Sequence, residues 1–143
     1  MLAFLLGSTM FLVMLASLAV MVALGRSRKY GKYTAWGVFL FALMAGSAAA
    51  LCFVGEGITW VLTFLCAVVG LPVAAIGIIA MFGVLGTIID LADGQPDGLA
   101  KTMALIVPVL LAVTGGDLGL YGTQATNGLS GAGAVLFGNL IGV

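Results

Sequence analysis

Residues 26–33 read RSRKYGKY and contain four of the chain's five basic residues, Arg26, Arg28, Lys29 and Lys32. The segments on either side, 1–25 and 34–54, contain no charged residue. At about 1.5 Å per residue, a helix over 1–25 is about 37 Å long, which exceeds a hydrocarbon core of about 30 Å. The sequence therefore predicts a helical hairpin that crosses a membrane twice, with the basic residues in its turn.

The composition indicates a membrane setting for the whole chain. Of its 143 residues, 63% are hydrophobic and 7% are charged, and the mean hydropathy is +1.31. A soluble domain carries about 25% charged residues, because its surface must be hydrated. We therefore expect an all-α integral membrane protein with a single membrane domain over 1–143. About four transmembrane helices and a short glycine-rich C-terminal segment are expected within it.

Uncharged apolar runs set the expected spans, at about 2–25, 34–54, 58–86 and 102–121, followed by an apolar C-terminal segment at 128–143. The third run contains Pro72, which removes a backbone donor and favours a kink. It predicts either one tilted, kinked span or a span of about 20 residues followed by an interfacial helix. The C-terminal segment either crosses the membrane, re-enters it or lies on it.

Two polar stretches separate the later spans. Residues 90–101, DLADGQPDGLAK, form a turn-rich loop, and Asp97 or Thr102 is a candidate N-cap for the helix that follows. Residues 123–127, TQATN, predict a polar hinge before the C-terminal segment. The three aspartates of the first loop are better explained by a solvated loop than by a metal site, because glycine and proline interrupt their helical spacing.

The basic residues predict the orientation of the chain. Lysine and arginine favour the cytoplasmic side in short loops. The fifth basic residue, Lys101, lies in the other loop expected on that side, so the N-terminus is expected outside. A bacterial or archaeal cytoplasmic membrane is the expected location. The basic turn then serves as a topology anchor and contacts anionic lipid headgroups, at about 1 kcal/mol per basic residue. Nucleic acid is a remote alternative.

The residue types argue against an enzyme. The chain has no histidine, which is the commonest general base and metal ligand, and neither a cofactor nor a metal is expected. Asp117, flanked by Gly115, Gly116 and Gly119, is the candidate for a polar pathway or a subunit contact, since an ionisable residue near a membrane span is a functional candidate. Pro72 and Pro108 are the candidate helix kinks.

Small residues predict close helix packing. Membrane helices associate where small residues let their backbones approach. The candidate packing positions are Gly46, Gly115, Gly119, Gly138 and Gly142. Nine glycines lie between 115 and 142, more than the packing of one monomer requires, and a homo-oligomer or a larger membrane complex is therefore expected.

The hairpin of 1–54 combines an apolar helix, a short basic loop and a second apolar helix, and in this it resembles the conjugative pilins of type IV secretion. The two further spans do not belong to a simple pilin, so no family is assigned. We expect a non-enzymatic structural subunit of an oligomeric or multi-protein membrane assembly, in secretion or conjugation, in a phage-related system or in bioenergetics. The alternative is a small channel or transporter with its pathway near Asp117 and the proline kinks.

Overall fold

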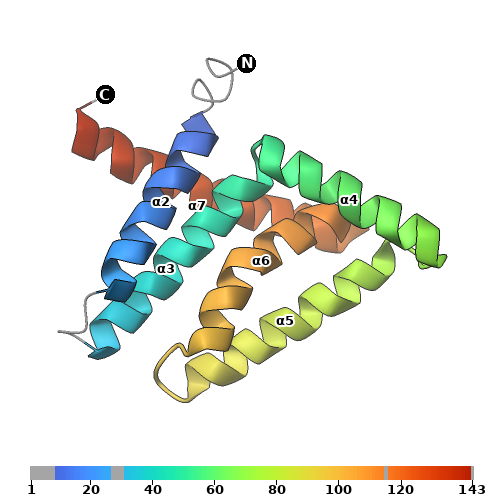
Figure 1. Ribbon diagram of the computed structural model, residues 1–143, viewed down its shortest axis with the longest axis horizontal. Helices are drawn as coiled ribbons and strands as arrows, with labels where there is room; N and C mark the ends of the chain where they lie inside the picture. Colours follow the sequence, from blue (N-terminus) through green and yellow to red (C-terminus); the bar gives the residue numbers. More distant parts are fainter. Residues whose placement is uncertain (1–8, 27–30, 115, 143) are drawn as a thin grey trace.

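The computed structural model describes residues 9–26, 31–114 and 116–142, and every regular element in these ranges is an α-helix (Figure 1). The expected all-α fold is confirmed. The helices, in chain order, are α2 (Thr9–Arg26), α3 (Gly31–Ala50), α4 (Phe53–Val69), α5 (Ala74–Ala92), α6 (Gly98–Thr114) and α7 (Gly116–Ile141).

Three of the described helices, α2, α3 and α5, are long and apolar enough to cross a membrane, which is fewer than the expected four or so. They contain 18, 20 and 19 residues. The helices α4 and α6 are apolar but have 17 residues each. At about 1.5 Å per residue they are about 25 Å long, which is shorter than a hydrocarbon core of about 30 Å. The three long helices are compatible with an integral membrane location.

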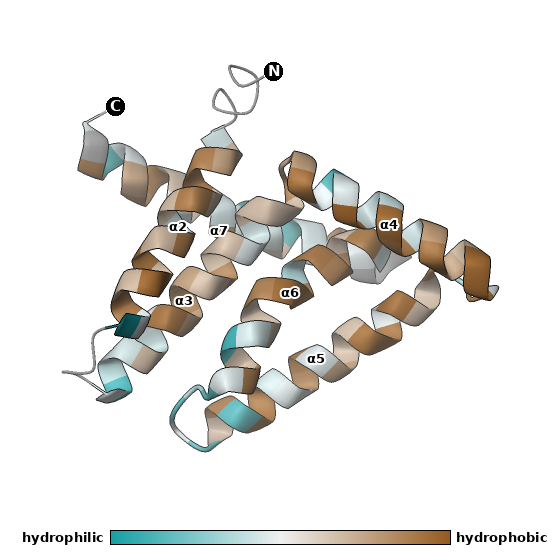
Figure 2. Cartoon of the chain, viewed as in Figure 1, coloured by the Kyte–Doolittle hydropathy of each residue, from teal (hydrophilic) through white to brown (hydrophobic). Residues whose placement is uncertain are grey.

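The helices α2, α3, α6 and α5 lie side by side in that order, because α3 packs against both α2 and α6, and α6 packs against α5 (Figure 1). The contacts use very small side chains. Ala42, Ala100 and Ala104 form part of one buried cluster between α3 and α6, and a Cβ added at Gly46 would lie 2.9 Å from the Ala104 carbonyl oxygen. Most of the helical ribbon is hydrophobic, whereas hydrophilic residues mark the end of α2, the start of α3 and the α5–α6 turn (Figure 2).

The expected span at 58–86 is divided between two helices, and this corrects the idea of a kink within one span. The helix α4 ends at Gly70, which adopts a left-handed conformation (φ 74°), and the N–H of Leu71 donates to the Cys66 carbonyl at 2.9 Å. Pro72 lies in the turn that follows and accepts the N–H of Ala75 at 2.8 Å. A left-handed glycine followed by a proline ends a helix rather than bending it.

The expected fourth span at 102–121 also differs, because α6 ends at Thr114 and α7 continues without a hinge through TQATN. Within α7, Thr123 donates to the Gly119 carbonyl and Ser130 donates to the Thr126 carbonyl at 2.8 Å. The two hydroxyl groups thus find their acceptors one turn earlier in the same helix. The C-terminal segment 128–143 is thus part of one long helix as far as Ile141, and α7 lies across α6, α3 and α2 (Figure 1).

Candidate functional site

The described basic residues gather at one end of the bundle. Arg26 ends α2, and Lys32 lies in the first turn of α3. Lys101, near the start of α6, lines a hollow of about 120 Å³ together with Gly25 and Gly31, which flank the α2–α3 turn. Residues about 70 positions apart in the sequence therefore meet at this basic end. Arg28 and Lys29, also predicted as anchors, lie outside the described residues.

The same end contains a helix cap that the sequence did not reveal. One carboxylate oxygen of Asp90, near the end of α5, accepts the backbone N–H of Asp97 at 3.1 Å and that of Ala100 at 3.0 Å. A helix start leaves its first N–H groups without partners, and this carboxylate satisfies one in α6 and another just before it. The cap thus comes from the preceding helix, while the hydroxyl of Thr102 donates to the Gly98 carbonyl. Asp90 ties the two ends of the α5–α6 loop together.

The residues proposed for a polar pathway are not brought together as a group of described side chains. Asp117 belongs to the first turn of α7, but its side chain is outside the described part. Pro72 lies in the α4–α5 turn, whereas Pro108 is buried inside α6. Pro108 is the one of the two that lies within a described helix, as a kink position requires.

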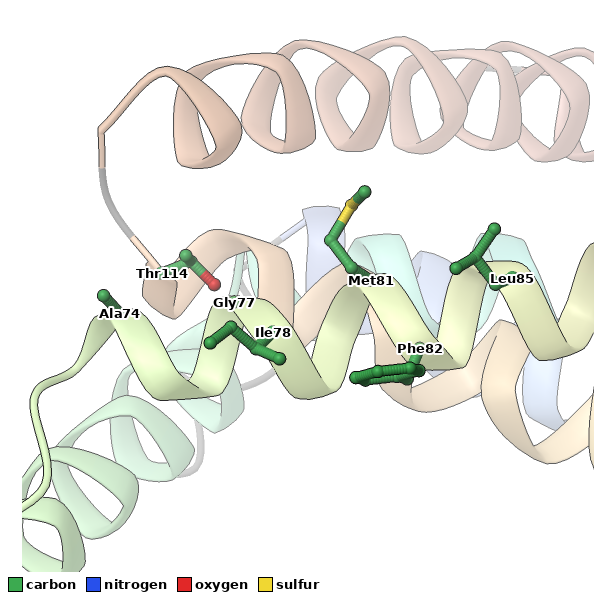
Figure 3. A pocket seen from close by; sticks show the side chains of 7 residues that line it. All are labelled: Ala74, Gly77, Ile78, Met81, Phe82, Leu85 and Thr114. Atoms are coloured by element: carbon green, nitrogen blue, oxygen red, sulfur yellow. The ribbon is translucent and has the colours of Figure 1, made fainter.

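A hollow of about 360 Å³ lies between the start of α5 and the end of α6 (Figure 3). Thr114 contributes the one polar side chain of its lining, and the Thr114 hydroxyl already donates to the Leu110 carbonyl at 2.8 Å. This hollow suits an apolar group and offers no charged side chain to a polar solute. Its lining residues are Ala74, Gly77, Ile78, Met81, Phe82, Leu85 and Thr114.

The predicted packing glycines fall into different environments. Gly46 is buried against the backbone of α6, and Gly119 lies next to the Leu111 carbonyl, 3.6 Å from where its Cβ would be. Gly138 lines a hollow between α2 and α7. Gly142 follows the end of α7 in a left-handed conformation (φ 75°), with no atom within 4 Å of its ideal Cβ. Gly115 lies outside the described residues.

The helix α7 has two different faces. Its inner face packs on the bundle through small side chains at a regular spacing of three and four residues: Gly119, Gly122, Thr126, Ser130 and Gly133. We call the opposite face the outward stripe, and it consists of Tyr121, Gln124, Gly128, Gly131, Val135 and Asn139. A Cβ added at Gly128 or Gly131 would meet no atom within 4 Å, whereas one at Gly133 would lie 2.8 Å from the Met44 methyl carbon. The outward stripe is therefore open to another helix.

The structure and the comparisons define only a broad class. The described residues contain no group of three or more His, Cys, Asp or Glu side chains that could hold a metal ion. Over residues 9–26, 31–114 and 116–142 the structure is all-α, and three of its helices are long and apolar enough to cross a membrane. Comparison with protein-family models, with curated proteins and with solved structures finds no match.

Proposed function

We propose that this chain is a non-enzymatic structural subunit of an oligomeric assembly in a membrane, and that its outward stripe on α7 contacts a further protein chain. One observation carries the proposal. The outward stripe combines two glycines that have open space around them with the exposed amide side chains of Gln124 and Asn139.

Lipid provides no hydrophobic force that drives helices together, so membrane helices associate through close backbone approach and polar side chains. Gly128 and Gly131 leave a shallow place for a neighbouring backbone, because neither carries a side chain. The amides of Gln124 and Asn139 flank this place along the helix and can each donate and accept hydrogen bonds. A second helix in contact with the outward stripe could provide hydrogen-bond partners for these two amide groups, which lipid hydrocarbon cannot do.

The orientation belongs to the same proposal. With the basic end on the cytoplasmic side, the end of α6 and the start of α7 lie towards the outer side of the membrane. The proposal is thus an integral protein of a bacterial or archaeal cytoplasmic membrane, whose assembly contact is on the outer half of the bundle; the three long apolar helices support the integral location. The second function raised by the sequence, a channel or transporter, depends on the side chain of Asp117, which is outside the described part, and no observation favours it.

A photo-reactive side chain can test the contact in native membranes. We expect benzoylphenylalanine at position 128 to give a cross-linked species heavier than the 14.4 kDa chain after illumination. The matched control is position 57 on α4, which is also an exposed helical glycine with no atom within 4 Å of its ideal Cβ. Cross-linking to protein at 57 but not at 128, or at neither, would contradict the proposed contact.

A further inference from the structure

Two hollows lie in line along one side of α3, between α2 and α6, and we call the two together the groove. The α3 residues that line them lie on one side of the helix: Gly31, Thr34, Ala35, Val38, Ala45 and Ala49. The helix α2 forms one wall, with Leu24 and Gly25 at one hollow and Met14 and Leu18 at the other. The helix α6 forms the second wall.

One end of the groove is polar and cationic. The hollow of about 120 Å³ between the α2–α3 turn and α6 is lined by Lys101 and Thr34, besides glycine and apolar residues. Arg26 and Lys32 adjoin the glycines that line it and are both exposed. An anionic group would therefore meet one lysine in the hollow and two further cations nearby, while the Asp90 carboxylate at the same end already accepts the backbone N–H groups of Asp97 and Ala100.

The other end of the groove is entirely apolar. Its hollow has a volume of about 260 Å³ and is lined by ten hydrophobic side chains from α2, α3, α4 and α6. An engineered apolar cavity of about 150 Å³ stays dry and binds benzene, so a hollow of this size and lining favours hydrocarbon over water. Val54 and Ile58 from the start of α4 belong to the lining at the end farther from Lys101.

Between the two hollows lies the buried cluster that contains Phe39, Ala42 and Ala104, and Met21 of α2 packs against this cluster. The two hollows are therefore not continuous inside the protein. Methionine is unbranched and has three rotatable side-chain bonds, which lets it adapt to a chain that passes beside it.

We propose that this groove binds one phospholipid with an anionic headgroup, whose phosphate lies at Lys101 and whose acyl chain lies in the apolar hollow. The dimensions agree with this. Leu110 is the last α6 residue that lines the apolar hollow, and the rise along α6 from Lys101 to Leu110 is about 14 Å. One leaflet of the hydrocarbon core is about 15 Å deep. A headgroup held at the basic end therefore places its acyl chain at the depth of the hollow, and this binding does not depend on the proposed assembly.

Native mass spectrometry of the purified chain in mild detergent can test the site. The protein is titrated with phosphatidylglycerol or with phosphatidylcholine of the same acyl chains, and retained lipid is counted. We expect one phosphatidylglycerol per chain and weaker retention of phosphatidylcholine. Lys101→Gln is expected to lower phosphatidylglycerol retention about fivefold, as the loss of one cation at a membrane surface predicts, and Lys101→Arg is expected to keep it.

Two further variants separate this site from general attraction to the basic end. Lys32→Gln removes an exposed charge that does not line the hollow, and retention is expected to stay within about twofold of the wild type. Ala49→Leu fills the floor of the apolar hollow and leaves every charge in place, so it is expected to lower retention of both lipids.

Equal loss in Lys32→Gln and Lys101→Gln, equal retention of the two lipids by the wild type, or unchanged retention in Ala49→Leu would each overturn the proposal. Displacement of the lipid by inorganic phosphate would contradict the proposed binding of the acyl chain in the apolar hollow. Far-ultraviolet circular dichroism identifies a variant that does not fold. If Lys101→Gln does not fold, lipid retention by Ala49→Leu tests the site in its place.

Discussion

Replacement of Gly46 by alanine is the sharpest test of the packing between α3 and α6. An ideal Cβ at this position would lie 2.9 Å from both the Ala104 carbonyl oxygen and the Leu105 carbonyl carbon. Real Cβ atoms essentially never approach backbone this closely, so the two helices must move apart. Overpacking of this kind costs about 1–3 kcal/mol, and the better helix propensity of alanine returns up to about 1 kcal/mol.

Gly57→Ala is the matched control, because Gly57 is exposed within α4 and no atom lies within 4 Å of its ideal Cβ. It is expected to stabilise the chain by about 0.5–1 kcal/mol. The gain in helix propensity is common to both variants, so their free energies of unfolding should differ by the overpacking cost of about 1–3 kcal/mol, with Gly46→Ala the less stable. Equilibrium unfolding in mixed micelles with increasing dodecyl sulfate measures this difference. Equal stability of the two variants would contradict the close backbone contact between α3 and α6 at Gly46.

Three further predictions concern the turns. Asp90→Ala removes the acceptor that caps α6 and should lower the free energy of unfolding by about 1–2 kcal/mol. Asp93 is exposed, so Asp93→Ala should change this free energy by less than about 0.5 kcal/mol. Equal effects of the two substitutions in the same unfolding assay would argue against the cap. Gly70→Ala places a side chain at φ 74° and should cost about 1–2 kcal/mol, measured in the same way, and an unaltered stability would contradict the left-handed end of α4. The orientation can be tested in a chain whose own cysteines are replaced by alanine. Gln95→Cys should react with a membrane-impermeant maleimide only from the cytoplasmic side, and Gly57→Cys only from the outer side. The reverse pattern would contradict the proposed orientation.

The apolar runs and the basic turn were sufficient to predict an all-α chain that contains a hairpin of two long helices, α2 and α3. Hydropathy identifies such segments because every backbone group within lipid must be bonded inside the helix. It did not separate α4 from α5, since the run from Ile58 to Ile89 is apolar throughout. The break depends on the left-handed conformation of Gly70, which a glycine among many others does not reveal.

The site was less predictable than the fold. Glycine content indicated close packing, but it did not show that Gly122 faces α6 while Gly128 faces outward, because that depends on how α7 crosses the bundle. Lys101 and the basic turn meet through the order of α2, α3 and α6 in space, which charge patterning alone does not fix. The sequence identifies Asp90 only as a loop carboxylate, because a cap supplied from another helix leaves no local sequence signal.

The assembly of this chain through α7 is tested most directly by native mass spectrometry of protein extracted gently from its own membranes. The wild type is expected to give a species heavier than the 14.4 kDa monomer, composed of several copies or of this chain with another. Gly128→Leu is expected to leave mainly the monomer, and Gly57→Leu, an equal change at an open glycine away from α7, is expected to keep the heavier species. A wild type that is monomeric and carries no other protein, or a heavier species that persists in Gly128→Leu, would contradict the proposed contact.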